Sequence, residues 1–163
     1  MHIKIKNKNF FLDNYKVKCA IGKRGIGLKK KEGDFITPRG KFKILYILYR
    51  KDRIGNLKSK INRFPIKKSM GWCDDPRSKY YNKLIKIPFK YNSEKLYRSD
   101  NSYDIILVLN FNIKPTRKGK GSAIFIHVAN KKYKPTAGCV ALKKKDLKNL
   151  IKKITKKTIV EVC

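Results

Sequence analysis

The sequence predicts a mainly β domain of packed mixed sheets with one substantial C-terminal helix. Two observations support this fold class, and a third bears on the number of domains. Apolar residues alternate or cluster in short runs through most of the chain, as strands require. A clear helical period occurs only in the last quarter, which favours packed sheets over an alternating βαβ fold. The 163 residues have about the length of one domain and contain no repeat or linker, so residues 1–163 are predicted to form a single domain.

The first part of the chain is predicted to be a β meander followed by one long strand. These strands are expected at residues 3–5, 10–12, 15–21 and 41–49. Residues 22–27 hold glycines at the wrong spacing for a dinucleotide fingerprint and lack a P-loop, so they are expected to form a flexible loop. Thr37-Pro38-Arg39-Gly40 predicts a tight turn before the long strand.

The second part combines irregular segments with two buried strands and the helix. Residues 50–103 have little periodicity and three prolines, which predicts long loops with short strands. Residues 104–111 and 122–129 are apolar runs of strand length. A final strand is expected at residues 158–162. The helix is indicated by apolar residues at i, i+3, i+4 and i+7, namely Leu147, Leu150, Ile151 and Ile154.

The most extreme feature of the composition is the net charge. Lys and Arg number 43 against 11 Asp and Glu, which gives +32 at pH 7. Such a charge invites a nucleic-acid-binding interpretation. Only eight of the 43 are Arg, the residue of two-pronged phosphate and base recognition, and the Lys residues are spread along the whole chain. Nucleic-acid binding is therefore not expected to be the primary function, and a basic nucleic-acid-binding module is kept as the alternative from another class.

The cysteines and the N-terminus bear on metal binding and compartment. Cys19, Cys73, Cys139 and Cys163 form no C-x-x-C pair and have no metal-ligand spacing. A disulfide among Cys19, Cys73 and Cys163 stays open, as does the oligomeric state. The basic N-terminus is not followed by an apolar signal-peptide core, so a cytoplasmic location is expected. No run approaches the ~18 apolar residues that a membrane span requires, and none is expected.

Two histidines are the only side chains suited by their ordinary pKa to base catalysis near neutral pH. His2 lies at an end that is expected to fray, which leaves His127. After a loop, Gly138 and Cys139 form a turn of small residues that can supply a thiol and backbone N–H groups for an oxyanion. We predict that Cys139 is a nucleophile and His127 its general base. The alternative is that both are structural residues. The positive field and an adjacent imidazolium would both lower the thiol pKa, which predicts a thiol that is partly ionised at neutral pH.

These residues resemble the signature of the L,D-transpeptidase (YkuD-like) catalytic domain, in which a strand histidine is followed, after a loop, by Ser/Thr-x-Gly-Cys. Ile126-His127 and Thr136-Ala137-Gly138-Cys139 match it. Residues 33–42 resemble the Thr-Pro-x-Gly-x-Phe segment typical of these domains. Residues 71–76 with Tyr81-Asn82, and Tyr103-Asp104, resemble one bacterial branch. The resemblance covers most of the chain, roughly residues 15–162.

The resemblance implies acyl transfer on peptidoglycan stem peptides or muropeptides, without a cofactor. The Cys139 thiol would attack the carbonyl of an L-centre joined to a terminal D-residue, and His127 would move the proton as a thioester forms. An amine acceptor would make the protein an L,D-transpeptidase. Water would make it an L,D-carboxypeptidase acting on recycled cytoplasmic muropeptides. The family resemblance implies a periplasmic or cell-envelope location, in contrast to the location expected from the N-terminus.

Three positions depart from the family pattern. Many members have a second histidine directly before Gly-Cys and an arginine two residues after the cysteine, where this chain has Ala137 and Ala141. Many also have glycine after the strand histidine, where this chain has Val128. His127 would therefore carry the base role alone, and substrate contacts made by the missing groups are not transferred. The partner that orients the imidazole is either a backbone carbonyl or Asn130.

Five further residues are candidates for the substrate groove: Trp72, Asp74, Asp75, Tyr81 and Thr136. The two carboxylates could bind a substrate amine, although Asp-Asp-Pro is first a turn signal. The two aromatic residues either line a groove wall or pack in the core. No spacing supports a metal site. Papain-like cysteine proteases are disfavoured because they place the cysteine well before the histidine.

Overall fold

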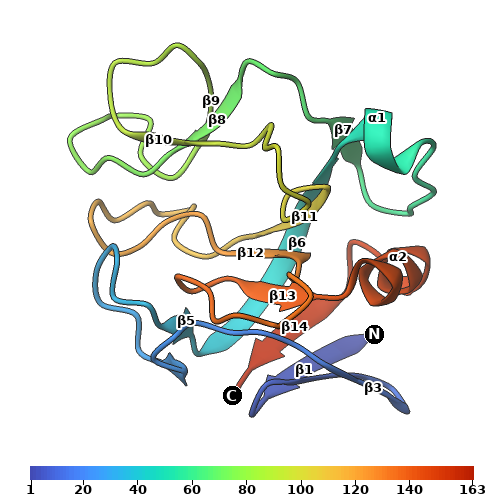
Figure 1. Cartoon of the computed structure of the whole chain (residues 1–163). Coiled ribbons are helices and arrows are strands. Elements are labelled where there is room, and N and C mark those ends of the chain that lie inside the picture. Colours follow the sequence, from blue (N-terminus) through green and yellow to red (C-terminus); the bar gives the residue numbers. More distant parts are fainter.

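The computed structural model describes residues 1–163 and is built mainly from β-strands (Figure 1). The strands are β1 (His2–Lys6), β2 (Asn9–Leu12), β3 (Tyr15–Lys18), β4 (Ile26–Gly27), β5 (Thr37–Pro38), β6 (Gly40–Tyr49), β7 (Arg63–Pro65), β8 (Met70–Cys73), β9 (Leu84–Lys86), β10 (Ser93–Lys95), β11 (Ile105–Leu109), β12 (Phe125–Val128), β13 (Val140–Leu142) and β14 (Ile159–Val162). The helices are α1 (Lys51–Ile54) and α2 (Lys144–Lys153). Neither helix is long and apolar enough to cross a membrane.

One mixed, nearly closed sheet of nine strands dominates the fold. Its order is β13-β12-β11-β6-β14-β1-β2-β3, with β7 added beside β6. Most pairs are antiparallel, whereas β1 with β14, β6 with β7, and β12 with β13 are parallel. Ala20, just after β3, exchanges two backbone hydrogen bonds of 2.8 Å with Ala141 in β13, which brings the two ends of the sheet together. The predicted mainly β fold with mixed sheets is confirmed.

The central strands are buried on both faces, which explains their unbroken apolar sequences. In β11, Ile105, Leu107 and Leu109 join a core of 26 buried residues, whereas Ile106 and Val108 face a second core of eight. The larger core also takes the buried face of α2. The smaller core lies beneath the three-stranded sheet β10-β8-β9, at the top of Figure 1. The candidate site is built on the side of β12 that faces the smaller core.

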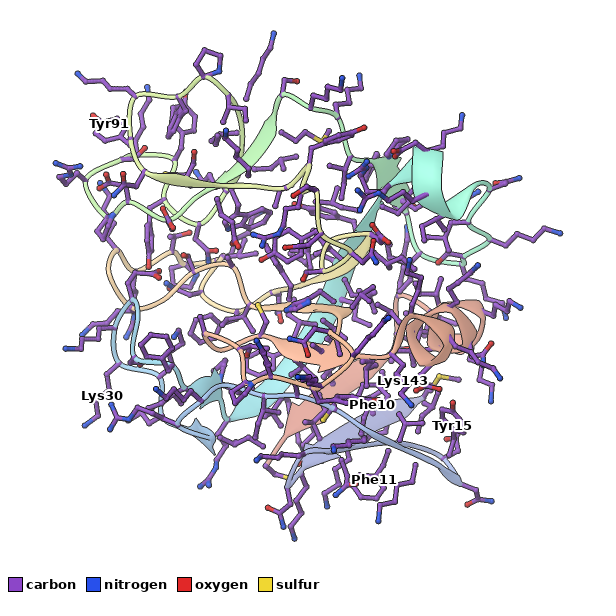
Figure 2. The ribbon with its side chains drawn as sticks, viewed as in Figure 1. Phe10, Phe11, Tyr15, Lys30, Tyr91 and Lys143 are labelled. Carbon is purple, nitrogen blue, oxygen red and sulfur yellow. The ribbon has the colours of Figure 1, made fainter.

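The C-terminal helix and strand follow the sequence prediction. Helix α2 buries Leu147, Leu150 and Ile151, and Ile154 follows at its end, so the predicted apolar stripe is confirmed. Figure 2 places Tyr15 of β3 next to this helix, where its hydroxyl donates to Asp146 at 2.7 Å. The last strand, β14, lies between β6 and β1.

Residues 22–40 differ from the prediction. The expected tight turn at Thr37–Gly40 is wrong, because residues 37–39 run extended alongside residues 25–27. The Thr37 and Arg39 N–H groups donate to the carbonyls of Gly25 and Gly27, at 2.9 and 2.8 Å. The expected flexible loop at residues 22–27 is therefore held in place. The buried Thr37 hydroxyl adds to this, since it accepts the Gly22 N–H at 2.7 Å.

Two smaller differences concern element boundaries. Strand β12 begins at Phe125 rather than at residue 122, because Ala123 has a φ of +50° that does not fit a strand. The short helix α1 lies in the segment that was predicted to be loops and short strands. Its side chains are not buried, so it leaves no apolar period in the sequence.

Leu107→Ala should lower the free energy of unfolding by about 2–5 kcal/mol, because Leu107 is fully buried in the central strand β11 and its removal leaves a cavity. Urea denaturation measures the change. Leu28→Ala is the matched control, since Leu28 is 75% exposed, and it should change stability by less than about 0.5 kcal/mol. Equal losses in the two variants would contradict this description of the core.

Candidate active site

The parallel pairing of β12 and β13 brings the two predicted catalytic residues together. Its register sets Ile126 against Val140 and His127 against Ala141, so Cys139 lies level with Phe125. The Phe125 N–H accordingly points at the Cys139 sulfur, at 3.4 Å. Cys139 and His127 then lie on the same face of neighbouring strands, two residues out of register. Both line one open cavity of about 610 Å³.

The turn before β13 is fixed by Thr136 and Gly138. The Thr136 hydroxyl donates to the Cys139 carbonyl at 2.6 Å and accepts the Gly138 N–H at 3.1 Å. Gly138 has a φ of +146°, and a Cβ at this position would lie 2.8 Å from the Ile36 carbonyl oxygen. Only glycine fits this conformation and space. Thr136 thus lines the cavity, as predicted for the groove, but its hydroxyl is used within the turn.

Two backbone donors at the turn are free. The Gly138 N–H is taken by Thr136, whereas the Ala137 and Cys139 N–H groups have no acceptor within the protein. A free N–H on the residue that carries the thiol is the arrangement that stabilises an oxyanion when that thiol attacks a carbonyl. Of the two residues predicted to supply oxyanion donors, Cys139 is therefore the better placed.

The His127 imidazole is oriented by a backbone carbonyl. Its Nδ1 lies 3.0 Å from the Val128 carbonyl oxygen, which can only accept, so Nδ1 carries the proton and Nε2 is the free base. Asn130 is instead used in the following loop, where its Oδ1 accepts the Lys132 and Lys134 N–H groups. The Tyr103 ring packs edge-on against the imidazole with the centroids 5.4 Å apart. Burial, with a smaller effect of Arg98, lowers the His127 pKa, which keeps the ring neutral at neutral pH.

The Cys139 thiol is held in its neutral form. It donates to the Ala123 carbonyl at 3.1 Å, and burial raises its pKa to about 12. The expectation of a partly ionised thiol at neutral pH is therefore wrong. The positive charges that were expected to lower the pKa lie mostly on the solvated surface, where water screens them. The structure thus presents a neutral thiol and a neutral imidazole in one cavity, a pair suited to proton removal during attack rather than before it.

Three carboxylates from distant parts of the chain line the same cavity: Glu32, Asp74 and Glu94. None forms an ion pair with Lys or Arg, although the chain holds 43 of these residues. Glu32 and Glu94 accept hydrogen bonds from the hydroxyls of Tyr81 and Tyr103, and Oδ1 of Asp74 is buried without a partner. Burial and then mutual repulsion raise the pKa values of Asp74 and Glu94.

The remaining groove candidates do not line the cavity. Trp72 is buried, packs edge-on against Phe125 and donates to Asn82 at 3.0 Å. Tyr81 is buried, and its hydroxyl accepts the Gly121 N–H at 3.0 Å. Asp75 is buried and accepts hydrogen bonds from the Arg77 backbone and guanidinium, as the turn signal predicts. These three residues are therefore buried structural residues outside the lining of the cavity.

The cavity also contains residues that the sequence did not single out as site residues. They are Lys29, Glu32, Glu94, Arg98 and Tyr103. A usable signal for the acidic ones was their rarity, since only 11 carboxylates occur in the chain. Lys29 had no such signal, because it is one of many lysines.

A comparison with protein families matches residues 3–162 to the YkuD family, the L,D-transpeptidase catalytic domain. The chain belongs to this family. A comparison with curated proteins finds no match. The YkuD match runs over nearly the whole chain, so it includes both the strand histidine and the Gly-Cys turn. In this YkuD domain the residue just before the Thr-Pro-x-Gly segment contacts the turn, because the Ile36 carbonyl packs against Gly138. The four cysteines are unpaired in the structure.

Alkylation of Cys139 by iodoacetamide should be slow at neutral pH and still accelerate at about pH 9. The thiolate is the reactive form, and below the thiol pKa its fraction grows roughly tenfold for each pH unit. Mass spectrometry of digested protein separates the Cys139 peptide from those of Cys19, Cys73 and Cys163. A rate that levels off below about pH 8 would show an ionised thiol and contradict the raised pKa.

Proposed function

We propose that this chain is a cysteine-dependent L,D-transpeptidase that acts on peptidoglycan stem peptides, with Cys139 as the nucleophile and His127 as the general base. One observation carries the proposal. In a chain of the YkuD family, the only thiol that lines the cavity and the only imidazole that lines it lie on one face of two neighbouring strands. The support for the substrate class comes from the family, whose catalytic domain is that of L,D-transpeptidases.

In the first half-reaction the Cys139 sulfur attacks the carbonyl of the L-centre, and Nε2 of His127 accepts the thiol proton. The free Cys139 N–H donates to the carbonyl oxygen as it becomes an oxyanion. The bond from this carbonyl carbon to the nitrogen of the terminal D-residue then breaks. The imidazolium returns its proton to that nitrogen, and the D-residue leaves from a thioester on Cys139.

In the second half-reaction an acceptor amine attacks the thioester and the Cys139 thiol is regenerated. The three cavity carboxylates favour an amine as the acceptor. An amine reaches the cavity mainly as an ammonium ion at neutral pH, and it must lose a proton before it attacks. Glu32, Asp74 and Glu94 attract the cation, and a carboxylate with a raised pKa is suited to take that proton.

Purified protein incubated with tetrapeptide-stem muropeptides and an amine acceptor should release the terminal D-residue and form the cross-linked product, both followed by mass. Cys139→Ala should abolish turnover. His127→Gln should lower kcat by about 10²–10⁴-fold, because the thiol loses its base. His2→Gln is the matched control and should leave kcat unchanged. Release without cross-linking would instead identify an L,D-carboxypeptidase, and no reaction in the unmodified protein would overturn both activities.

Asp74→Asn tests whether the cavity carboxylates assist the amine acceptor in the second half-reaction. The substitution keeps the size of the side chain and removes its charge, so the ratio of cross-linked to hydrolysed product should fall by about three- to tenfold. Release of the D-residue should change less than this ratio. Asp13→Asn, at an exposed position away from the cavity, is the control. An unchanged product ratio in Asp74→Asn would contradict a role of this carboxylate in binding or deprotonating the acceptor amine.

A further inference from the structure

Lys29 is a buried cation placed beside the Gly138-Cys139 turn. Its side chain is only 3% exposed although it lines the cavity, and its Nζ lies 3.5 Å from the point where a Cβ of Gly138 would be. A lysine is rarely buried to this degree unless the ammonium is paired. The surrounding chain therefore holds this charge beside the turn that carries Cys139, rather than leaving it in solvent.

Two glycines make room for the Lys29 side chain. A Cβ on Gly121 would lie 2.5 Å from Cε of Lys29 and 2.9 Å from its Cδ, which is closer than such atoms can approach. Gly138 leaves the space next to the ammonium group. The aliphatic part of Lys29 thus runs past Gly121 and ends at the turn that carries Cys139.

Asp34 fixes the ammonium in position. Its Oδ1 lies 2.6 Å from Nζ of Lys29, and the Asp34 side chain is 4% exposed. The carboxylate also accepts the N–H groups of Lys30, Lys31 and Ile36. These hydrogen bonds and Lys29 outweigh burial and hold the Asp34 pKa at about 2, so the carboxylate stays ionised. Asp34 is thus an anchored anion that orients a single cation.

We propose that Lys29 is the electrostatic partner of Cys139, whose ammonium stabilises the negative charge that develops on the sulfur and on the attacked carbonyl oxygen. Its part in acyl transfer rests on the proposed function, whereas its effect on the thiol does not. An ammonium acts strongly where water is excluded, because the local dielectric constant is low. In the same direction, the charge of Lys29 lowers the pKa of Cys139 against the larger effect of burial.

The test measures the rate at which iodoacetamide alkylates Cys139, as a function of pH, in Lys29→Met. Methionine keeps an unbranched chain of similar length and removes the charge. The plot of log rate against pH should move by about one unit to higher pH, so that the rate at a given pH falls roughly tenfold. Lys30→Met is the matched control. Lys30 is exposed at the rim of the molecule (Figure 2), so its loss changes the net charge equally and should leave the plot in place.

The sign of the effect separates an electrostatic role from a structural one. If Lys29 only braces the loop, its loss should loosen the turn, expose the thiol and accelerate alkylation. Asp34→Asn adds a second criterion, because removing the anion leaves the cation and should not slow the reaction. If the ion pair were purely structural, Lys29→Met and Asp34→Asn would instead change the alkylation rate of Cys139 in the same direction. An unchanged or faster rate in Lys29→Met would overturn the proposal.

The double variant Lys29→Met/Asp34→Asn covers the possibility that an unpaired buried carboxylate prevents folding of the single variant. It removes both charges and should still alkylate more slowly than Asp34→Asn alone. With muropeptides, Lys29→Met should lower kcat by about tenfold and leave KM unchanged, because the charge acts only as negative charge develops. Alkylation needs no peptide, so a slowed thiol in a protein that does not turn over muropeptides would sustain this inference and refute the proposed function.

Discussion

The parallel pairing of β12 with β13 is the constraint on which the candidate active site depends. Parallel neighbours cannot be joined by a tight turn, so the chain leaves β12 at its far end and crosses back before β13 begins. After the crossover, Cys139 lies level with Phe125. Because side chains alternate along a strand, His127 lies on the same face of the sheet as Phe125 and Cys139. The buried central strands hold this geometry, because a slip of one residue would turn His127 into the larger core.

The electrostatics of the cavity differ from those of the surface. The chain carries +32 overall, yet the thiol and imidazole are both neutral, and three carboxylates without cationic partners line the same space. Burial accounts for the neutral pair, since it disfavours every charged form. Lys29 differs from the solvated lysines around it because its ammonium is buried and paired with Asp34 beside the turn that carries Cys139. The functional charges are few and local, and the net charge is a poor guide to them.

The features that could be predicted from the sequence are those determined by residues close together in the chain. The apolar runs of β6 and β11, the stripe of α2 and the order of His127 and Cys139 are all readable from neighbouring residues. Prediction failed or stayed open where the outcome depends on distant partners. The pairing of residues 25–27 with 37–39 replaced a turn by an extended segment. The packing of Trp72 on Phe125 decided between the two alternatives that the sequence left open for this residue, in favour of the core. Lys29 could not be found, because the space it occupies is made by Gly121 and Gly138, far along the chain.

The bridge between Ala20 and Ala141 has a further consequence for recognition. Many proteins bind peptides by adding them as a strand to an open sheet edge. Here β13, which directly follows Cys139, pairs with β12 on one side and is bridged to Ala20 through Ala141 on the other, so its middle residue offers no free edge. A peptide of mixed L and D centres would in any case form an irregular ladder, because successive side chains would not alternate as in an L-strand. We therefore expect the proposed stem peptide to be recognised at this point through side chains and individual backbone groups, which respond to the stereochemistry of each centre rather than to an extended shape.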